Sequence, residues 1–380
     1  MKTLLKLGLT LTLMIGSITT NATNKYFENQ KPHTAKNKQF IKVALLLDTS
    51  NSMDGLIDQA KAQLWSIVNE LSYAKCNDQR PNLQIALYEY GNDNLNSHEG
   101  YIRQVLGFTN DLDDISKELF SLTTNGGSEF CGQVIQSSLN QLDWGNNADD
   151  LKLIFIAGNE PFTQGKVNYK HAATNANKKD VTVNTIFCGN YQQGVSTLWK
   201  DGAKLTNGDY LAIDHNQKTV HIASPYDDAI LELNKRLNKT YIAYGKRGVA
   251  KATMQMTQDN EAKSYNKTNA VSRTISKSSH FYKNSTWDLV DAIEEDKVEL
   301  DSLDDTSLPV ELKGKSTKDI KIYVAKKSKE RLQIQKEIQE LNTKRRTYFA
   351  SKQKETKNDL ENAMIQAIKT QAKKKNYQWN

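Results

Sequence analysis

The chain has 380 residues, of which 38% are hydrophobic and 25% charged, and its formal net charge is +7. This length suits one large domain with an additional segment. No stretch approaches the twenty or so apolar residues that cross a bilayer, which excludes a membrane protein with several spans. The charge is uneven: residues 321–380 hold sixteen Lys and Arg against six Asp and Glu, so this tail carries +10 and the rest sums to −3.

The first 22 residues have the pattern of an export signal. Lys2 and Lys6 give a positive start, residues 7–18 are almost wholly apolar or small, and Ala22 offers a cleavage point. We therefore expect an exported, extracytoplasmic protein, periplasmic or secreted, without a transmembrane segment. Residues 23–39 are polar and are expected to form a flexible lead-in.

From residue 40 to about 240, strand and helix patterns alternate. This predicts an α/β fold with a doubly wound, mostly parallel six-stranded sheet. Strands are expected at residues 41–47, 83–90, 102–108, 151–157, 181–188 and 210–213. Helices are expected at residues 56–73, 112–122, 131–142, 168–179, 195–205 and 227–237. The second and third strands are joined by a polar turn rich in Gly and Asn, which predicts a hairpin.

The first strand ends in three oxygen-bearing side chains, Asp48, Ser50 and Ser52. They fall at a strand-to-helix turn, on the sheet edge where open α/β folds bind ligands. One carboxylate and two hydroxyls suit a hard cation such as Mg²⁺, with Mn²⁺ or Ca²⁺ as alternatives. The simplest alternative is that Ser50 and Ser52 only cap the following helix while Asp48 favours its positive end.

Two other kinds of site share part of this motif. An EF-hand loop would need Gly at Met53 and Glu at Gln59, so it is excluded. An aspartyl-phosphate enzyme of the haloacid-dehalogenase type would have a second Asp where this chain has Ser50.

The Asp-x-Ser-x-Ser motif after an apolar strand resembles the metal-ion-dependent adhesion site (MIDAS) of the von Willebrand factor type A domain. The resemblance covers residues 40–240 and implies that two later loops complete the site. In the Gly-rich loop 125–129, Ser128 is the expected ligand, with Glu129 as the alternative one residue away. Asn159 stands where many family members have Asp, so it offers a carbonyl oxygen without a charge.

Cys131 and Cys188 are both expected at this edge of the sheet, and Cys76 at the opposite end. If the exported chain forms one disulfide, we expect it between Cys131 and Cys188. The six His are scattered, without His-Glu-x-x-His, and Gly-x-Ser-x-Gly is also missing. A zinc protease or a serine hydrolase therefore has no support.

The remaining chain is predicted as two segments. Residues 241–318 form a polar arm with a short helix at 287–293, and residues 319–380 form a basic long helix or coiled coil. The long segment has no Pro or Gly from 319 to about 372 and a narrow apolar stripe that includes Ile334 and Ile338. The helix is a candidate for self-association. Lys and Arg on its outer faces could contact anionic surfaces such as membrane headgroups or nucleic acid, although such charges more often only solvate a helix. A nucleic-acid partner is not expected.

Together these features predict a metal-dependent protein-binding module and not an enzyme. As the family resemblance implies, the bound cation would accept an Asp or Glu carboxylate from a protein partner. The alternative is a metal-independent scaffold with a degenerate site that assembles through its tail. Metal-assisted hydrolysis is less favoured, because only Glu129 and Glu160 offer themselves as a general base.

Overall fold

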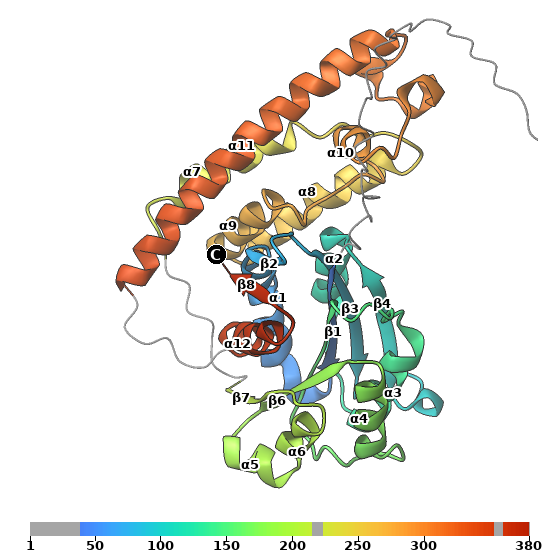
Figure 1. The fold of residues 1–380 in the computed structure, drawn as a ribbon, viewed down its shortest axis with the longest axis vertical. Coiled ribbons are helices and arrows are strands. Elements are labelled where there is room, and N and C mark those ends of the chain that lie inside the picture. The colour runs from blue at the N-terminus through green and yellow to red at the C-terminus, as the bar shows by residue number, and fades with distance from the viewer. Residues whose placement is uncertain (1–38, 215–222, 353–359, 380) are drawn as a thin grey trace, which may run out of the picture. The chain divides into compact units, whose positions relative to one another are not determined.

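A six-stranded sheet organises the chain, with strand order β4-β3-β1-β5-β6-β7 (Figure 1). The computed structural model describes residues 39–214, 223–352 and 360–379, so the predicted signal peptide and most of the lead-in lie outside the described residues. β4 pairs antiparallel with β3, and the other neighbours are parallel. The strands are β1 (Phe40–Asp48), β3 (Asn82–Tyr90), β4 (Ile102–Thr109), β5 (Leu151–Gly158), β6 (Thr182–Cys188) and β7 (Tyr210–Ile213). The predicted sheet, including its hairpin, is confirmed.

The central strand β1 is buried on both faces. Ile41, Val43 and Leu47 belong to one hydrophobic core, whereas Ala44 and Leu46 belong to the other. Such a strand reads as a continuous apolar run, because neither face meets water. Its first polar side chain beyond the core, Asp48, therefore lies at the carboxyl edge of the sheet.

Helices cover both faces of the sheet. The first core includes side chains of α1 (Asp54–Leu71), α2 (Leu112–Ser121) and α12 (Leu360–Lys373). The second includes side chains of α3 (Cys131–Gln141), α4 (Tyr169–Lys178) and α6 (Trp199–Lys204). The sheet is thus doubly wound, as predicted.

One predicted helix is divided in two. Residues 195–205 fall on α5 (Tyr191–Ser196) and α6, and Leu198 between them has a left-handed φ of 71°. A side-chain-bearing residue in this conformation interrupts a right-handed helix.

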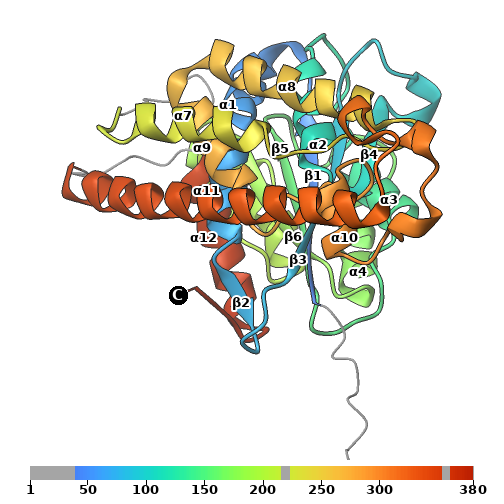
Figure 2. The same cartoon turned by 90° about the horizontal axis from the view of Figure 1, so that it is seen from above.

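A second group of helices follows the sheet domain. It comprises α7 (Asp227–Asn238), α8 (Gly248–Tyr265), α9 (Lys267–Lys277), α10 (Leu289–Glu294) and the 36-residue α11 (Thr317–Lys352). α11 packs against α7, α9 and α10, and Figure 2 shows it running past them. Short 3₁₀ turns occupy Asn51–Met53, Ser97–Glu99, Leu300–Ser302, Asp305–Ser307 and Val310–Leu312. No helix in the described ranges is long and apolar enough to cross a membrane.

The helices α8 and α9 lie where the sequence indicated only a polar arm. α9 is almost wholly buried, yet many of its buried side chains are polar. Asn269 donates to the carbonyls of Lys61 and Ala62 on α1, and Ser276 donates to Asn69. A helix that buries hydrogen-bonded polar groups lacks the apolar periodicity by which helices are recognised.

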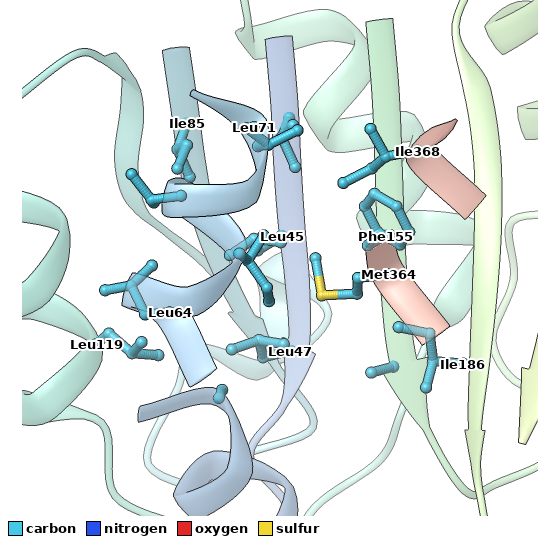
Figure 3. A pocket seen from close by; sticks show the side chains of 15 residues that line it. Leu45, Leu47, Leu64, Leu71, Ile85, Leu119, Phe155, Ile186, Met364 and Ile368 are labelled. Carbon is cyan, nitrogen blue, oxygen red and sulfur yellow. The ribbon is translucent and has the colours of Figure 1, made fainter. Parts of the chain in front are cut away.

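The C-terminal segment also differs from the prediction. α12 is a separate helix that lies beside α1 on the sheet (Figure 1). Its Met364 and Ile368 point toward the sheet side chains Leu45 and Phe155 in an apolar pocket (Figure 3). Beyond it, β8 (Tyr377–Trp379) pairs antiparallel with β2 (Ala74–Cys76). This part of the apolar stripe thus packs on the sheet domain and does not extend a coiled coil along α11.

Candidate functional site

The end of β1 presents its polar side chains as the sequence predicts. Asp48 is fully buried, and its Oδ1 accepts a hydrogen bond of 2.8 Å from the backbone N–H of Ser50. Ser50 is extended, with φ −66° and ψ 164°, and the chain then enters the 3₁₀ turn that leads into α1. The Oγ atoms of Ser50 and Ser52 lie 3.4 Å apart. The turn therefore gathers a carboxylate and two hydroxyls on one side.

The Gly-rich loop 125–129 lies against this turn. The backbone N–H of Asn125 donates to the carbonyl of Thr49 at 3.0 Å. Asn92, from the β3–β4 hairpin, donates its amide N–H to the carbonyl of Thr123 at 2.9 Å, which fixes the start of the loop. A Cβ at Gly127 would lie 2.2 Å from the carbonyl oxygen of Gly91, so this close approach requires glycine.

Within this loop, Glu129 approaches Asp48. Glu129 is 4% exposed, and its carboxylate lies beside that of Asp48. A Cβ at Gly91 would lie 2.7 Å from Cγ of Glu129 and 2.9 Å from Oδ1 of Asp48, so both side chains fill the space above this glycine. Ser128 is half-buried, and its hydroxyl has no hydrogen-bond partner among the described residues. The carboxylate of Glu129, the alternative of the two predicted positions, thus lies beside Asp48, and the choice of ligand between Ser128 and Glu129 stays a prediction.

The loop after β5 supplies the remaining predicted residue. Nδ2 of Asn159 donates to Oγ of Ser52 at 3.1 Å, while its Oδ1 is buried without a donor. The neighbouring Glu160 has a hydrogen-bond partner of its own, since its Oε2 accepts a hydrogen bond of 3.2 Å from Nε2 of Gln164. Gln164 in turn accepts the backbone N–H of Glu129 at 3.1 Å. Gln164 thus positions the Glu129 segment, a role that no sequence pattern indicates.

We call the group formed by Asp48, Ser50, Ser52, Glu129 and Asn159 the Asp48 cup. Burial raises the pKa of Asp48 well above its ordinary value, and the Glu129 carboxylate raises it further. Burial also raises the pKa of Glu129. Neither carboxylate has an ion-pair partner among the described residues.

Three oxygens of the cup are buried acceptors without a donor. They are Oδ2 of Asp48, Oε2 of Glu129 and Oδ1 of Asn159. Unpaired buried acceptors are costly, and two of these belong to carboxylates. A divalent cation would satisfy all three, and the donor set is wholly oxygen, as Mg²⁺, Mn²⁺ and Ca²⁺ prefer. Over the described ranges, no group of three or more His, Cys, Asp or Glu is arranged for a metal, so the cup depends on its hydroxyls and amide.

The cysteines are not joined as expected. Cys131 and Cys188 are both buried free thiols, and so is Cys76. Sγ of Cys131 lies 3.9 Å from Oη of Tyr90, which donates its hydrogen bond to the carbonyl of Ala157. Burial raises the pKa of both thiols near the cup. Cys131 and Cys188 thus pack as small apolar side chains.

Comparison with protein families identifies the sheet domain. Residues 42–198 match the model of the von Willebrand factor type A domain, which is less than half of the chain. The predicted resemblance is therefore confirmed for this segment, and the predicted boundary at residue 240 stays a prediction. No curated protein matches the chain.

Solved structures show similarity over just under half of the chain. The conserved hypothetical protein BatB from Bacteroides thetaiotaomicron is 16% identical, with a TM-score of 0.35, over 46% of this chain and 90% of its own. Proximal thread matrix protein 1 from the mussel byssus, with a zinc-occupied MIDAS motif, is 13% identical, with a TM-score of 0.35, over 47% and 43%. The SpRpn10 VWA domain is 15% identical, with a TM-score of 0.35, over 48% and 99%. These similarities are too distant to indicate function.

Proposed function

We propose that the chain is an extracytoplasmic protein whose von Willebrand factor type A domain binds a protein partner through a divalent cation held in the Asp48 cup. Domains of this family are typically protein-interaction modules. The observation that carries the proposal is the set of three unpaired buried oxygens on Asp48, Glu129 and Asn159. A folded chain tolerates such a set when an external cation satisfies it.

Asp48, Ser50 and Ser52 would hold the cation directly. Glu129 would take the place expected for Ser128, and Asn159 would contribute its amide oxygen. Mg²⁺ suits this set, since it binds through one or two carboxylates and keeps several of its waters. When bound, the cation would serve as a Lewis-acid contact for an anionic group.

The partner group that we propose is an Asp or Glu carboxylate. Asp48 alone leaves one positive charge of a dication uncompensated, and a carboxylate from a partner would neutralise it. Glu129 supplies the same charge from within the chain. A partner carboxylate would therefore compete with Glu129 for the cation, and the variant Glu129→Gln should bind an acidic partner more tightly at saturating Mg²⁺.

We propose a binding protein and not a metal-assisted hydrolase. A hydrolase would need a general base beside the cation that is free to accept a proton. Glu160, the carboxylate nearest in sequence to Asn159, is engaged by Gln164. Glu129 lies in the cup itself. Export through residues 1–22 and recognition outside the cytoplasm remain part of this proposal.

The test is thermal unfolding of the full chain with and without Mg²⁺ or Mn²⁺. We expect metal to raise the melting temperature, by an amount that corresponds to about 2.7 kcal/mol at a metal concentration 100 times the dissociation constant. Asp48→Ala should abolish this rise. The matched control is Asp58→Ala, an exposed carboxylate on α1, which should keep it.

If neither metal stabilises the wild-type chain, the proposal fails, and the metal-independent scaffold takes its place. A partner is then sought by capture from envelope extract with and without EDTA. A partner retained in EDTA would also contradict metal-dependent recognition.

A further inference from the structure

The outer face of α11 carries a continuous series of lysines. The opposite face of the helix packs on the protein through buried side chains that include Ile320, Val324, Ile334 and Ile338. The exposed lysines on the outer face are Lys318, Lys321, Lys326, Lys329, Lys336 and Lys344. Lys313 and Lys315, in the segment just before the helix, are exposed as well. We call these eight residues the lysine face.

Almost none of this charge is neutralised by the chain. Within the described ranges, Lys336 is the one member of the lysine face with an ion-pair partner, Glu340, at a distance of 3.9 Å. The exposed acidic side chains along the same stretch are Glu311, Asp319 and Glu340. The face therefore presents a net charge of about +5, against an overall net charge of +7.

Large apolar side chains stand exposed among these lysines. Ile322 is 60% and Leu332 is 59% exposed on the outer side of α11, and Val310, shortly before the helix, is 83% exposed. A face that served only to solvate the helix would need no exposed apolar side chains. Lysines mixed with exposed aliphatic residues are typical of helices that lie at a membrane surface, where apolar groups enter the headgroup boundary.

We propose that the lysine face binds the surface of a membrane rich in anionic lipids. Lysine ammonium groups are attracted to an anionic surface, and a cluster of four to eight of them suffices for recognition. The face follows a single 36-residue helix, about 54 Å long at 1.5 Å per residue, which matches a flat surface. Nucleic acid is the less favoured partner, because Ile322 and Leu332 would gain nothing from phosphate contacts.

This inference does not depend on the Asp48 cup. It assigns a separate role to the helical region, which would hold the metal-binding domain close to a membrane. The two proposals are distinguishable by experiment, since membrane binding should survive both EDTA and Asp48→Ala.

The experiment is co-sedimentation of the full chain with vesicles. We expect binding to vesicles of equal parts phosphatidylcholine and phosphatidylglycerol, little binding to phosphatidylcholine alone, and loss of binding in high salt. The fourfold variant Lys318→Glu, Lys321→Glu, Lys326→Glu and Lys329→Glu should lower the partition coefficient at least about tenfold. The double variant Ile322→Ser and Leu332→Ser should lower it about threefold or more while keeping the salt dependence.

A matched control separates this face from total charge. The control variant replaces four exposed lysines of the sheet domain by Glu, namely Lys166, Lys178, Lys179 and Lys204. It changes the net charge equally and should retain most of the binding. Circular dichroism melting of each variant confirms that the fold is kept.

Three outcomes would overturn the proposal. The first is the absence of binding to anionic vesicles, and the second is an equal loss of binding in the two fourfold variants. The third is binding of duplex DNA, or self-association of the chain, that depends on the lysine face while vesicle binding does not.

Discussion

Two regions of this chain bury carboxylates, and they differ in whether the chain itself supplies positive charge to neutralise them. The Asp48 cup leaves one oxygen of each of its two carboxylates, Oδ2 of Asp48 and Oε2 of Glu129, without a donor. The second region, which we call the Arg273 cluster, consists of Arg273, Lys277, Asp113 and Asp259. It joins α2 of the sheet domain to α8 and α9.

In the Arg273 cluster, the chain supplies its own cations. Nη1 of Arg273 lies 2.8 Å from Asp113 and its Nε lies 2.6 Å from Asp259, while Nζ of Lys277 lies 2.8 Å from Asp259. Tyr282 also donates a hydrogen bond of 2.6 Å to Asp113. Arg273 is 1% exposed and Lys277 is fully buried. The cluster is therefore a buried ion-pair network that connects the helical region to the sheet domain.

The pKa shifts of the two regions run in opposite directions. Burial alone would raise the pKa of Asp259, but the charges of Lys277 and Arg273 lower it below its ordinary value. Burial raises the pKa of Asp48, and its neighbour Glu129 adds to the rise. Buried carboxylates with internal cations are structural, whereas the unpaired carboxylates of the cup indicate a cation from outside the chain.

The largest effect that we expect is from Arg273→Met. Removing Arg273 leaves an uncompensated buried charge on Asp113 and takes one of its two cations from Asp259, which should cost about 3–5 kcal/mol of unfolding free energy. The measurement is urea unfolding in EDTA. Arg236→Met, which breaks an exposed pair with Glu337, is the control and should cost less than about 1 kcal/mol. Equal losses in the two variants would contradict the structural role of the cluster.

Neutralising one Asp in each region should have effects of opposite sign. Asp48→Asn removes an uncompensated buried charge, so it should stabilise the metal-free chain at neutral pH by about 1–2 kcal/mol. Asp113→Asn removes a paired charge and should destabilise the chain by about 3 kcal/mol. Urea unfolding in EDTA measures both. Destabilisation by Asp48→Asn in EDTA would mean that Asp48 is already compensated within the chain.

The pH dependence of stability should separate the regions as well. Because the pKa values of Asp48 and Glu129 are raised on folding, the folded chain binds more protons than the unfolded chain. Their contribution should grow as the pH falls from neutral toward about 4, the ordinary value for a carboxyl group, and be lost as the pH rises through the folded pKa. Asp259 behaves oppositely, since its lowered pKa stabilises the fold above about pH 4, and this contribution is lost in acid.

The measurement is the unfolding free energy in EDTA between pH 4 and neutrality. The difference between wild type and Asp48→Asn isolates the cup, and we expect the relative stability of the wild type to rise as the pH falls over this range. With saturating Mg²⁺ the dependence should flatten or reverse, because the cation holds the charged carboxylates. If the difference in unfolding free energy between wild type and Asp48→Asn stayed constant across this pH range, the titrating group would not be Asp48.

Elements defined by local sequence patterns can be predicted from the sequence, whereas elements that depend on distant contacts cannot. The apolar run of β1, the spacing of three and four residues in α1 and the polar turn between β3 and β4 are local patterns, so these elements and the position of Asp48 follow from them. α9 is not recognised, because its buried Asn269, Ser276 and Lys277 look like surface residues until their partners are known. The place of α12 on the sheet depends on contacts nearly three hundred residues away in the chain, such as that of Lys369 with Glu70, and no periodicity encodes them.

In the Asp48 cup, the sequence likewise does not identify which of two adjacent residues is the ligand. The sequence predicts the Gly-rich loop as part of the site but leaves two neighbouring positions, Ser128 and Glu129, open as the ligand. Composition cannot decide between them. The packing of Glu129 over Gly91, beside Asp48, becomes visible only in the structure.

The smallest effect concerns where the second negative charge of the cup lies. Asn159 brings no charge to the cup, whereas Glu129 brings a carboxylate to Asp48 from the segment just before α3. If charge count sets metal affinity, Glu129→Gln should weaken Mg²⁺ binding about tenfold, corresponding to about 1.4 kcal/mol. Asn159→Asp should restore most of that affinity in the Glu129→Gln background. Ser128→Ala should leave the Mg²⁺ affinity of the wild-type chain unchanged.

Isothermal titration with Mg²⁺ of the four combinations of residues at positions 129 and 159 measures the coupling between them directly. An Asn159→Asp change without effect in either background would show that residue 159 does not contact the cation, and the cup would then rest on Asp48, its two serines and Glu129.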